Sequence, residues 1–216
     1  MKEKVGLIIL GHTKFGENSV VLHTLCREYG RKGFLVKVGQ KNRPTLFQPL
    51  NILEAEVTVN PRSDLWWAGS LTARTPLNGI RGDIRKNTMS LFMAEVLFKV
   101  VKEGAGEEGL FDWCERSILT LDALETDFSN YHLRFLLELA SAMGFSPTAG
   151  DLAPFAGNHL KELQYLLSSP LEEAMLIPMS GMSRNETALS VLRYLEHHTD
   201  SAINVRSLTV LRDVFA

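Results

Sequence analysis

Stretches of alternating apolar and polar residues follow one another through the first third of the chain. Turn-forming residues, mainly glycine, proline, asparagine and aspartate, separate them. The alternation is clearest in Leu50–Asn60, where Glu54, Glu56 and Thr58 occupy one face. The pattern predicts five strands, at Val5–Leu10, Ser19–Cys26, Phe34–Gly39, Leu50–Asn60 and Leu65–Thr72. Five short antiparallel strands predict a small β-barrel of the OB type or a relative of it.

Two turns in this region carry much of the predicted chemistry. Lys14–Ser19 should close a hairpin between the first two strands, because Gly16 and Asn18 tolerate positive φ. Arg27–Gly33 is predicted as a second turn, and it contains three cations.

The spacing of the apolar residues changes near Pro76, and Asn78 and Gly79 indicate a linker there. From here apolar residues recur every three or four positions, which predicts helices. Asp83 is expected to cap the first of these, which ends at Gly104. Further helices are expected at Leu110–Glu125, Tyr131–Met143, His159–Leu167, Leu171–Leu176, Thr187–His198 and Ser207–Ala216. Gly150–Gly157 is predicted as a loop, and Ser183 and Glu186 as a capping box.

The fold class predicted from this division is α+β, an N-terminal OB-fold barrel followed by an all-α helical domain. The domains are expected at residues 1–78 and 79–216. The net charge of −2 hides an asymmetry between them. Residues 1–82 hold 12 Lys and Arg against 6 Asp and Glu, whereas residues 83–216 hold 11 against 19. A basic unit joined to an acidic one suggests two surfaces with different tasks, although halves can also differ by chance.

Several classes of protein are disfavoured by composition. No apolar run approaches the ~18 residues that a membrane span needs. The run Val5–Leu10 is too short for an export signal. Cys26 and Cys114 lack paired spacing, which favours buried reduced thiols and a cytoplasmic location.

No motif indicates a catalytic centre, so we expect no catalytic residues and no enzyme. The chain has neither a Gly-x-Ser-x-Gly elbow nor a Gly-x-x-x-x-Gly-Lys phosphate loop. His197, His198 and Asp200 lie close in sequence at a helix end, but adjacent helical residues diverge by about 100° and cannot close on one metal.

The positive signal is a set of cations in the barrel half, since several Lys and Arg on one face suit a phosphate backbone. The candidate nucleic-acid-binding residues are Lys14, Arg27, Arg31, Lys32, Lys37, Lys41 and Arg43. The alternative is an ordinary solvated rim. Bases also stack on exposed aromatic rings. Phe15 and Tyr29 lie in turns, and one of Trp66 and Trp67 should face outward.

An ordered set of segments resembles the RecO family of bacterial recombination mediators. The set begins with Lys14-Phe-Gly-Glu-Asn-Ser19 between two apolar strands, then Leu25-Cys-Arg-Glu-Tyr-Gly-Arg31 and Leu46-Phe-Gln-Pro49. It continues with His132-Leu-Arg-Phe-Leu-Leu-Glu-Leu139 and ends with Arg206-Ser-Leu-Thr-Val-Leu-Arg212. The likeness extends over nearly the whole chain, in order.

The resemblance implies a bacterial DNA repair protein of the cytoplasm and nucleoid, without a catalytic centre. Members of the family bind single- and double-stranded DNA and anneal complementary strands. They also act with RecR to load RecA onto strands coated by single-strand-binding protein. They dock the acidic C-terminal tail of that protein on the helical domain, and Arg134 matches an arginine associated with this tail. The alternative for Arg134 is an ion pair with Glu138 one helical turn away.

Two departures from the family pattern matter. The loop after Gly39 is short and carries few cations, so DNA affinity should be weak or depend on Arg27, Arg31 and Lys32. The four zinc-binding cysteines of many members are missing, so we predict no zinc and no other cofactor. The alternative functions are a protein scaffold whose DNA binding is weak or lost, and an unrecognised enzyme of nucleic acid.

Overall fold

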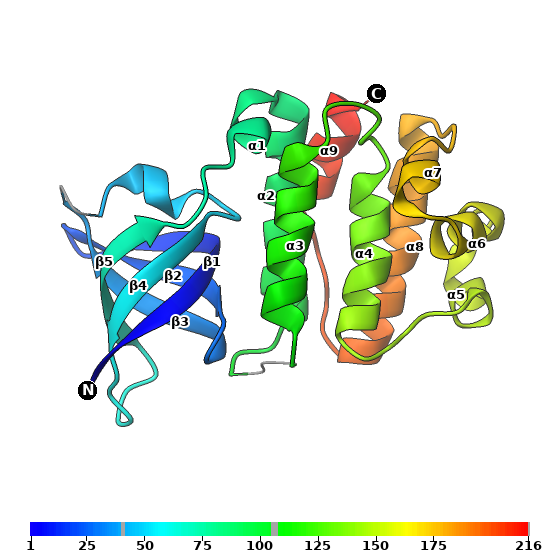
Figure 1. Cartoon of the computed structure of the whole chain (residues 1–216). Coiled ribbons are helices and arrows are strands. Elements are labelled where there is room, and N and C mark those ends of the chain that lie inside the picture. The colour runs from blue at the N-terminus through cyan, green and yellow to red at the C-terminus, as the bar shows by residue number, and fades with distance from the viewer. Residues whose placement is uncertain (40–41, 105–107, 216) are drawn as a thin grey trace. The chain divides into compact units, whose positions relative to one another are not determined.

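The computed structural model describes residues 1–39, 42–104 and 108–215. Two compact units emerge from its contacts (Figure 1). The first combines Met1–Asn78 with Val101–Ile118, and the second combines Gly79–Val100 with Leu119–Ala216. The chain is thus an N-terminal barrel followed by a helical region, as the sequence predicts.

The strands of the first unit close into a five-stranded barrel in the order β1-β2-β3-β5-β4, with β4 pairing back to β1. All pairs are antiparallel except β3 with β5. This is the OB arrangement. The strands are β1 (Lys2–Phe15), β2 (Ser19–Cys26), β3 (Gly30–Lys37), β4 (Ile52–Thr58) and β5 (Trp66–Ala73), and a 3-10 turn, η1 (Pro44–Phe47), precedes β4.

The period of two along the strands builds the barrel core. In β4 the apolar side chains Leu53, Ala55 and Val57 point inward, while Glu54 and Glu56 are exposed. The fully buried rings of Phe34 and Phe47 add to the same core. The prediction that Glu54, Glu56 and Thr58 share one face is confirmed, and that face is exposed to solvent.

Two strands differ from their predicted bounds by more than two residues. β1 continues past Leu10 to Phe15, because a bulge near Gly11 lets its polar second half pair with β2. β3 begins at Gly30, so Arg31 and Lys32 lie in a strand and not in the predicted turn. Cross-strand pairing here outweighs the turn preference of the local sequence.

The helices follow the barrel along the chain. They are α1 (Asn78–Gly82), α2 (Ile84–Val100), α3 (Leu110–Ala123), α4 (Tyr131–Ala142), α5 (Ala149–Ala156), α6 (Leu160–Ser168), α7 (Leu171–Met175), α8 (Gly181–Thr199) and α9 (Ser207–Val214). The predicted cap of α2 is confirmed, since the Asp83 carboxylate accepts a hydrogen bond from the Arg85 backbone N–H at 2.8 Å.

The predicted linker at Asn78 and Gly79 is instead the short helix α1. A tertiary contact fixes it, because the Ile80 N–H donates to the Asp122 carboxylate at 2.7 Å. The Ile80 side chain is also fully buried. Burial and an external acceptor together outweigh the turn preference of Asn-Gly.

The predicted loop at Gly150–Gly157 is also wrong, since α5 occupies it. Thr148 and Asp151 form a capping box that satisfies donors of the first turn. Pro154 lies inside the helix, where it cannot donate to the Gly150 carbonyl. Both residues are exposed, so water can reach that carbonyl, and the helix ends two residues later.

The N-cap of helix α8 lies three residues before the predicted capping box. This cap is Ser180, whose hydroxyl accepts from the Ser183 N–H at 3.1 Å. Glu186 does not reach back to Ser183, because its carboxylate lies 2.7 Å from the His159 ring. The competing serine and a histidine distant in sequence therefore displace the predicted box.

A carboxylate from another helix caps α9. Glu95 in α2 accepts hydrogen bonds from the backbone N–H groups of Arg206 and Ser207, at 3.0 and 2.9 Å, and from the Ser207 hydroxyl. Partial burial acts to raise the pKa of Glu95, but these hydrogen bonds outweigh it and leave the pKa below its usual 4.5.

Replacing Glu95 with glutamine should destabilise the helical unit by about 1–2 kcal/mol at pH 7, the usual cost of a lost cap. Because the folded pKa is lowered, the contribution of Glu95 is present above pH 4.5 and lost as the pH falls toward the folded pKa. Urea unfolding at several pH values measures this. The difference in free energy of unfolding between the wild type and Glu95→Gln should become smaller below pH 4.5. A difference that does not change with pH would contradict the capping role.

Candidate nucleic-acid interface

The outer face of β1, β2, β3 and β5 forms a continuous surface that we call the β2–β3 face. Its position follows from register, because directly paired residues share one side of a sheet. Val20, Leu22, Phe34 and Val36 point into the core, so the residues between them point outward. The face comprises Phe15, Ser19 and Lys37 in one row and Thr13, Val21, Leu35 and Trp67 in the next, followed by Gly11, His23 and Gly33.

Two exposed aromatic rings stand on this face. Phe15 is 52% exposed and Trp67 is 51% exposed. The neighbouring Trp66 faces the core, where its indole N–H donates to the Ser63 carbonyl at 2.8 Å. The prediction that one tryptophan faces outward is therefore confirmed. Tyr29 is only partly exposed, and its ring packs edge-on against Trp66 with centroids 4.8 Å apart.

Between the rings lies an apolar floor of Val21 and Leu35. In the next row the His23 ring nitrogen lies 2.9 Å from the Thr13 hydroxyl. Burial and the nearby Arg31 cation lower the pKa of His23 below 6.5, which favours the neutral ring. The face therefore offers two stacking rings over a mainly uncharged floor, with Lys37 at its edge.

Three candidate cations lie at one end of the barrel. Lys37 ends β3 and shares the outer row with Phe15. Lys14 pairs with Val20, so it projects from the inner side at the barrel mouth. Arg43 is exposed and follows Asn42, whose side-chain amide donates to the Lys37 carbonyl at 3.1 Å. Lys41 lies outside the described residues.

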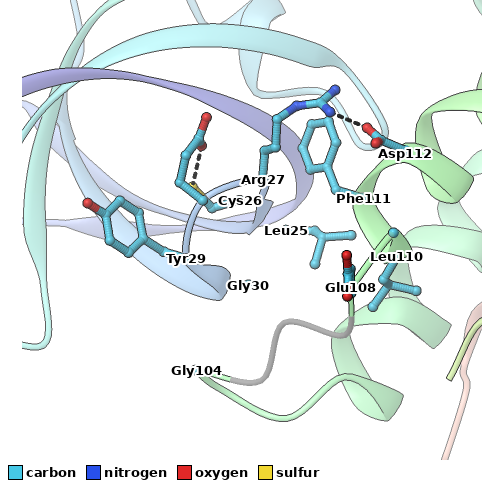
Figure 2. A pocket seen from close by; sticks show the side chains of 12 residues that line it. Leu25, Cys26, Arg27, Tyr29, Gly30, Gly104, Glu108, Leu110, Phe111 and Asp112 are labelled. Carbon is cyan, nitrogen blue, oxygen red and sulfur yellow. Dashed lines mark hydrogen bonds and ion pairs between the residues drawn. The ribbon is translucent and has the colours of Figure 1, made fainter. Parts of the chain in front are cut away.

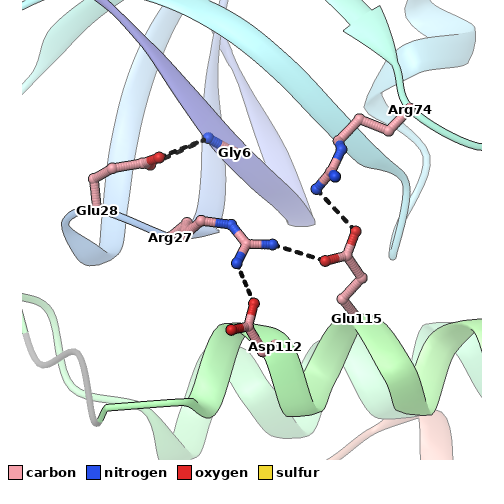
Figure 3. A network of polar contacts seen from close by, with 6 residues as sticks. All are labelled: Gly6, Arg27, Glu28, Arg74, Asp112 and Glu115. Carbon is pink, nitrogen blue, oxygen red and sulfur yellow. Dashed lines mark hydrogen bonds and ion pairs between the residues drawn. The ribbon is translucent and has the colours of Figure 1, made fainter.

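Arg27 lies at the opposite end of the β2–β3 hairpin, about 24 Å away for eight strand residues. Its guanidinium pairs with Asp112 and, at 2.8 Å, with Glu115 (Figure 3). The guanidinium carbon also lies 4.3 Å from the centre of the Phe111 ring. Glu115 also binds Arg74 at 3.0 Å. The network fixes the first turns of α3 to the barrel, so it satisfies the charge of Arg27 internally.

The other two cations near this turn are also engaged. Arg31 lies 3.9 Å from the Glu103 carboxylate, and its carbonyl accepts from the Gly104 N–H at 2.9 Å. The Lys32 ammonium lies 4.0 Å from the centre of the Trp66 ring, a cation–π contact at the barrel end. The structure thus separates Lys14, Lys37 and Arg43 from Arg27, Arg31 and Lys32.

A pocket of about 480 Å³ adjoins Arg27, between the Leu25–Gly30 turn and the start of α3 (Figure 2). Its lining includes the carboxylates of Glu28, Glu108 and Asp112, and Arg27 is the one cation among the described residues that line it. One Glu28 oxygen accepts from the Gly6 N–H at 3.1 Å. The excess of negative charge makes this pocket a poor phosphate site.

Sequence reasoning missed the carboxylates that engage Arg27 and Arg74. Asp112 and Glu115 are three residues apart, so they share one helix face. That spacing marks an acidic stripe but does not identify its partner more than 80 residues earlier in the chain.

In the helical unit Arg134 makes the ion pair with Glu138 that the sequence offered as the alternative to tail binding, with 2.6 Å between the Nε and carboxylate atoms. One terminal nitrogen of the same guanidinium donates to the carbonyls of Leu166 and Ser169, at 2.6 and 2.9 Å. Arg134 therefore neutralises the C-terminal end of α6, and its side chain is 20% exposed.

Both thiols are buried and unpaired, as expected from their spacing. Burial raises the pKa of Cys26 to about 12 and raises that of Cys114 still further, so both stay protonated at pH 7. Within residues 1–39, 42–104 and 108–215, no group of three or more His, Cys, Asp or Glu side chains could hold a metal ion.

None of the helices in the described ranges is long and apolar enough to cross a membrane. Residues 1–67 match the family model described as "Recombination protein O N terminal", and residues 81–151 match "Recombination protein O C terminal". The barrel and the start of the helical region therefore each match their own model.

Curated relatives extend the match over the whole chain. The "DNA repair protein RecO" of Phocaeicola vulgatus is 28% identical over an alignment 241 positions long, and that of Bacteroides fragilis is 29% identical over one 243 positions long. Both alignments cover 100% of each chain. The protein of the same name from Flavobacterium johnsoniae is 30% identical over 157 residues, which cover 70% of this chain and 66% of the relative. The chain belongs to the RecO family of DNA repair proteins.

Proposed function

We propose that this protein is a non-catalytic mediator of DNA repair and homologous recombination in the bacterial cytoplasm and nucleoid. It binds single- and double-stranded DNA, anneals complementary strands, and acts with RecR to load RecA onto strands coated by single-strand-binding protein. The observation that carries the proposal is the β2–β3 face, where Phe15 and Trp67 stand half-exposed beside Lys37.

The chemistry of this face suits a single strand. Exposed rings stack on bases of any sequence, and cations beside them neutralise the backbone. Phe15 in β1 and Trp67 in β5 have β2 and β3 between them on this face, so the two rings can take different bases of one strand. Annealing needs bases held without sequence readout, and stacking provides that.

Replacing Lys14 and Lys37 together with alanine should weaken binding to a labelled single-stranded oligonucleotide and reduce its salt dependence. Each lost phosphate contact should lower the slope of log affinity against log salt by about 0.7, so the pair should lower it by about 1.4. Fluorescence anisotropy from low to moderate salt measures this. The matched control is Lys2→Ala with Lys4→Ala, on β1 beside β4. An unchanged slope in the Lys14/Lys37 variant would argue against backbone contacts at this end.

For the second partner we propose that the acidic tail of single-strand-binding protein reaches Arg134. The Glu138 carboxylate already pairs with the Arg134 guanidinium, so the tail must displace that carboxylate. Glu138→Gln should therefore bind a labelled acidic tail peptide more tightly, about 2- to 5-fold, since exposed ion pairs contribute up to about 1 kcal/mol. Glu125→Gln, a change at an exposed site, is the control. Equal affinities in the two variants would place the tail elsewhere.

A protein scaffold with weak DNA binding is the second candidate function. It is favoured by the carboxylates at Arg27 and Arg31 and by the contact of Lys32 with Trp66, which leave few cations for a phosphate backbone. The anisotropy experiment separates the two candidates, because a scaffold would bind the tail peptide but not the oligonucleotide.

A further inference from the structure

An apolar groove of about 510 Å³ lies in the helical unit, between α6 and the segment that includes α7 and the residues after it. Tyr165 is 47% exposed and Leu176 is 64% exposed, and both line the groove beside Ile177 and Pro178. Exposed apolar side chains gathered in one concavity mark an interaction site more often than exposed residues scattered singly.

The charges in the groove are mostly negative. Among the described residues that line it are two carboxylates, Glu162 and Glu173, and one cation, Lys161. One oxygen of Glu162 is buried and has no hydrogen-bond partner among the described residues. A buried acceptor of this kind is stabilised by an incoming donor. The part of the chain that contains the groove is also negatively charged, since residues 83–216 hold 19 Asp and Glu against 11 Lys and Arg.

We propose that this groove docks a segment of a partner protein that carries an apolar anchor side chain next to lysine or arginine. The anchor fills the space between Tyr165 and Leu176, and the cation reaches Glu162 and Glu173. Aromatic anchors in a pocket with charged groups at its rim are the usual composition of such sites.

The same charges disfavour an acidic segment. Its carboxylates would face Glu162 and Glu173, and like charges brought together at an interface oppose binding. Arg134, the residue proposed for the acidic tail, does not line this groove. The groove is therefore a second docking surface, with the opposite charge preference from the proposed tail site.

The test is selection from a display library of random 12-residue peptides on the immobilised full-length protein, with subtraction against its Leu176→Asp variant. Peptides that survive subtraction should carry a large apolar residue adjacent to lysine or arginine. Their affinity, measured by anisotropy, should fall by about 5- to 10-fold in the Glu162→Gln/Glu173→Gln double variant. Lys102→Ala, at an exposed site outside the helical unit, is the control and should leave it unchanged.

Three results would overturn the proposal: enrichment of acidic peptides, no enrichment above the subtracted background, or affinity indifferent to the two glutamine substitutions. Sedimentation of the wild-type protein decides whether the occupant is a second copy of this chain. A dimer that Leu176→Asp converts to a monomer would also overturn it. DNA binding by Leu176→Asp should equal that of the wild type, so failure here is distinguishable from failure of the proposed DNA interface.

Discussion

Replacing Trp67 with alanine is expected to weaken single-stranded DNA binding by roughly 5- to 150-fold, the equivalent of about 1–3 kcal/mol for one lost base stack. Phe15→Ala should have an effect of the same kind, because the two rings are equally exposed on the same face. The combined variant should lose more affinity than either alone, since rings on the non-adjacent strands β1 and β5 take different bases.

Fluorescence anisotropy with a labelled oligonucleotide measures these losses, and circular dichroism establishes that the variants fold. Both rings are half exposed, so their removal leaves little of the core unfilled. Ile84→Ala is a matched control, because Ile84 is 71% exposed on α2 in the other unit. If Trp67→Ala and Ile84→Ala bind DNA equally, the β2–β3 face is not the stacking surface.

Replacing Gly79 with alanine should strongly destabilise the helical unit. The added Cβ would lie 2.0 Å from the Asp122 carbonyl oxygen, which is backbone and cannot rotate away. The same carbonyl accepts from the Lys86 ammonium at 3.0 Å, and the Asp122 carboxylate accepts from the Ile80 N–H. Relieving the clash must break part of this set, so we expect a loss of about 3 kcal/mol or more.

Thermal unfolding followed by circular dichroism measures the effect, expected as a fall in Tm of roughly 6–12 °C. The same short helix supplies the control. A Cβ at Gly82 meets nothing within 4 Å, so Gly82→Ala should be neutral or slightly stabilising. Equal Tm values for the two variants would mean that α1 can move away from Asp122 at little cost.

The sequence predicted the barrel well because its signals are local. Alternating residues and glycine-rich turns locate β2 and β4 to within two residues, and the five strands exist as expected. Errors arose where a distant group decides the local structure. The helix at Gly79 depends on Asp122, and the predicted capping box at Ser183 is lost because the Glu186 carboxylate lies beside His159.

In the candidate site, too, local features could be predicted from the sequence and those set by distant residues could not. Alternation required one tryptophan to face outward, and register identifies it as Trp67. Which cations stay available could not be predicted, because the carboxylates at Arg27 come from a helix more than 80 residues away. A count of lysine and arginine therefore overstates the charge that the barrel can offer to a phosphate backbone.

Closure of the barrel has one further consequence. β1 pairs with β2 on one side and with β4 on the other, so within the described residues every strand has two neighbours. Such a sheet has no strand that is an edge along its whole length, although β3 pairs with β5 only over Phe34–Val36 and Trp66–Ala68. A full-length edge is what templates aggregation or accepts an added strand from another chain. Recognition by the barrel then depends mainly on side chains and loops, and these can change in evolution without altering the hydrogen-bonded framework.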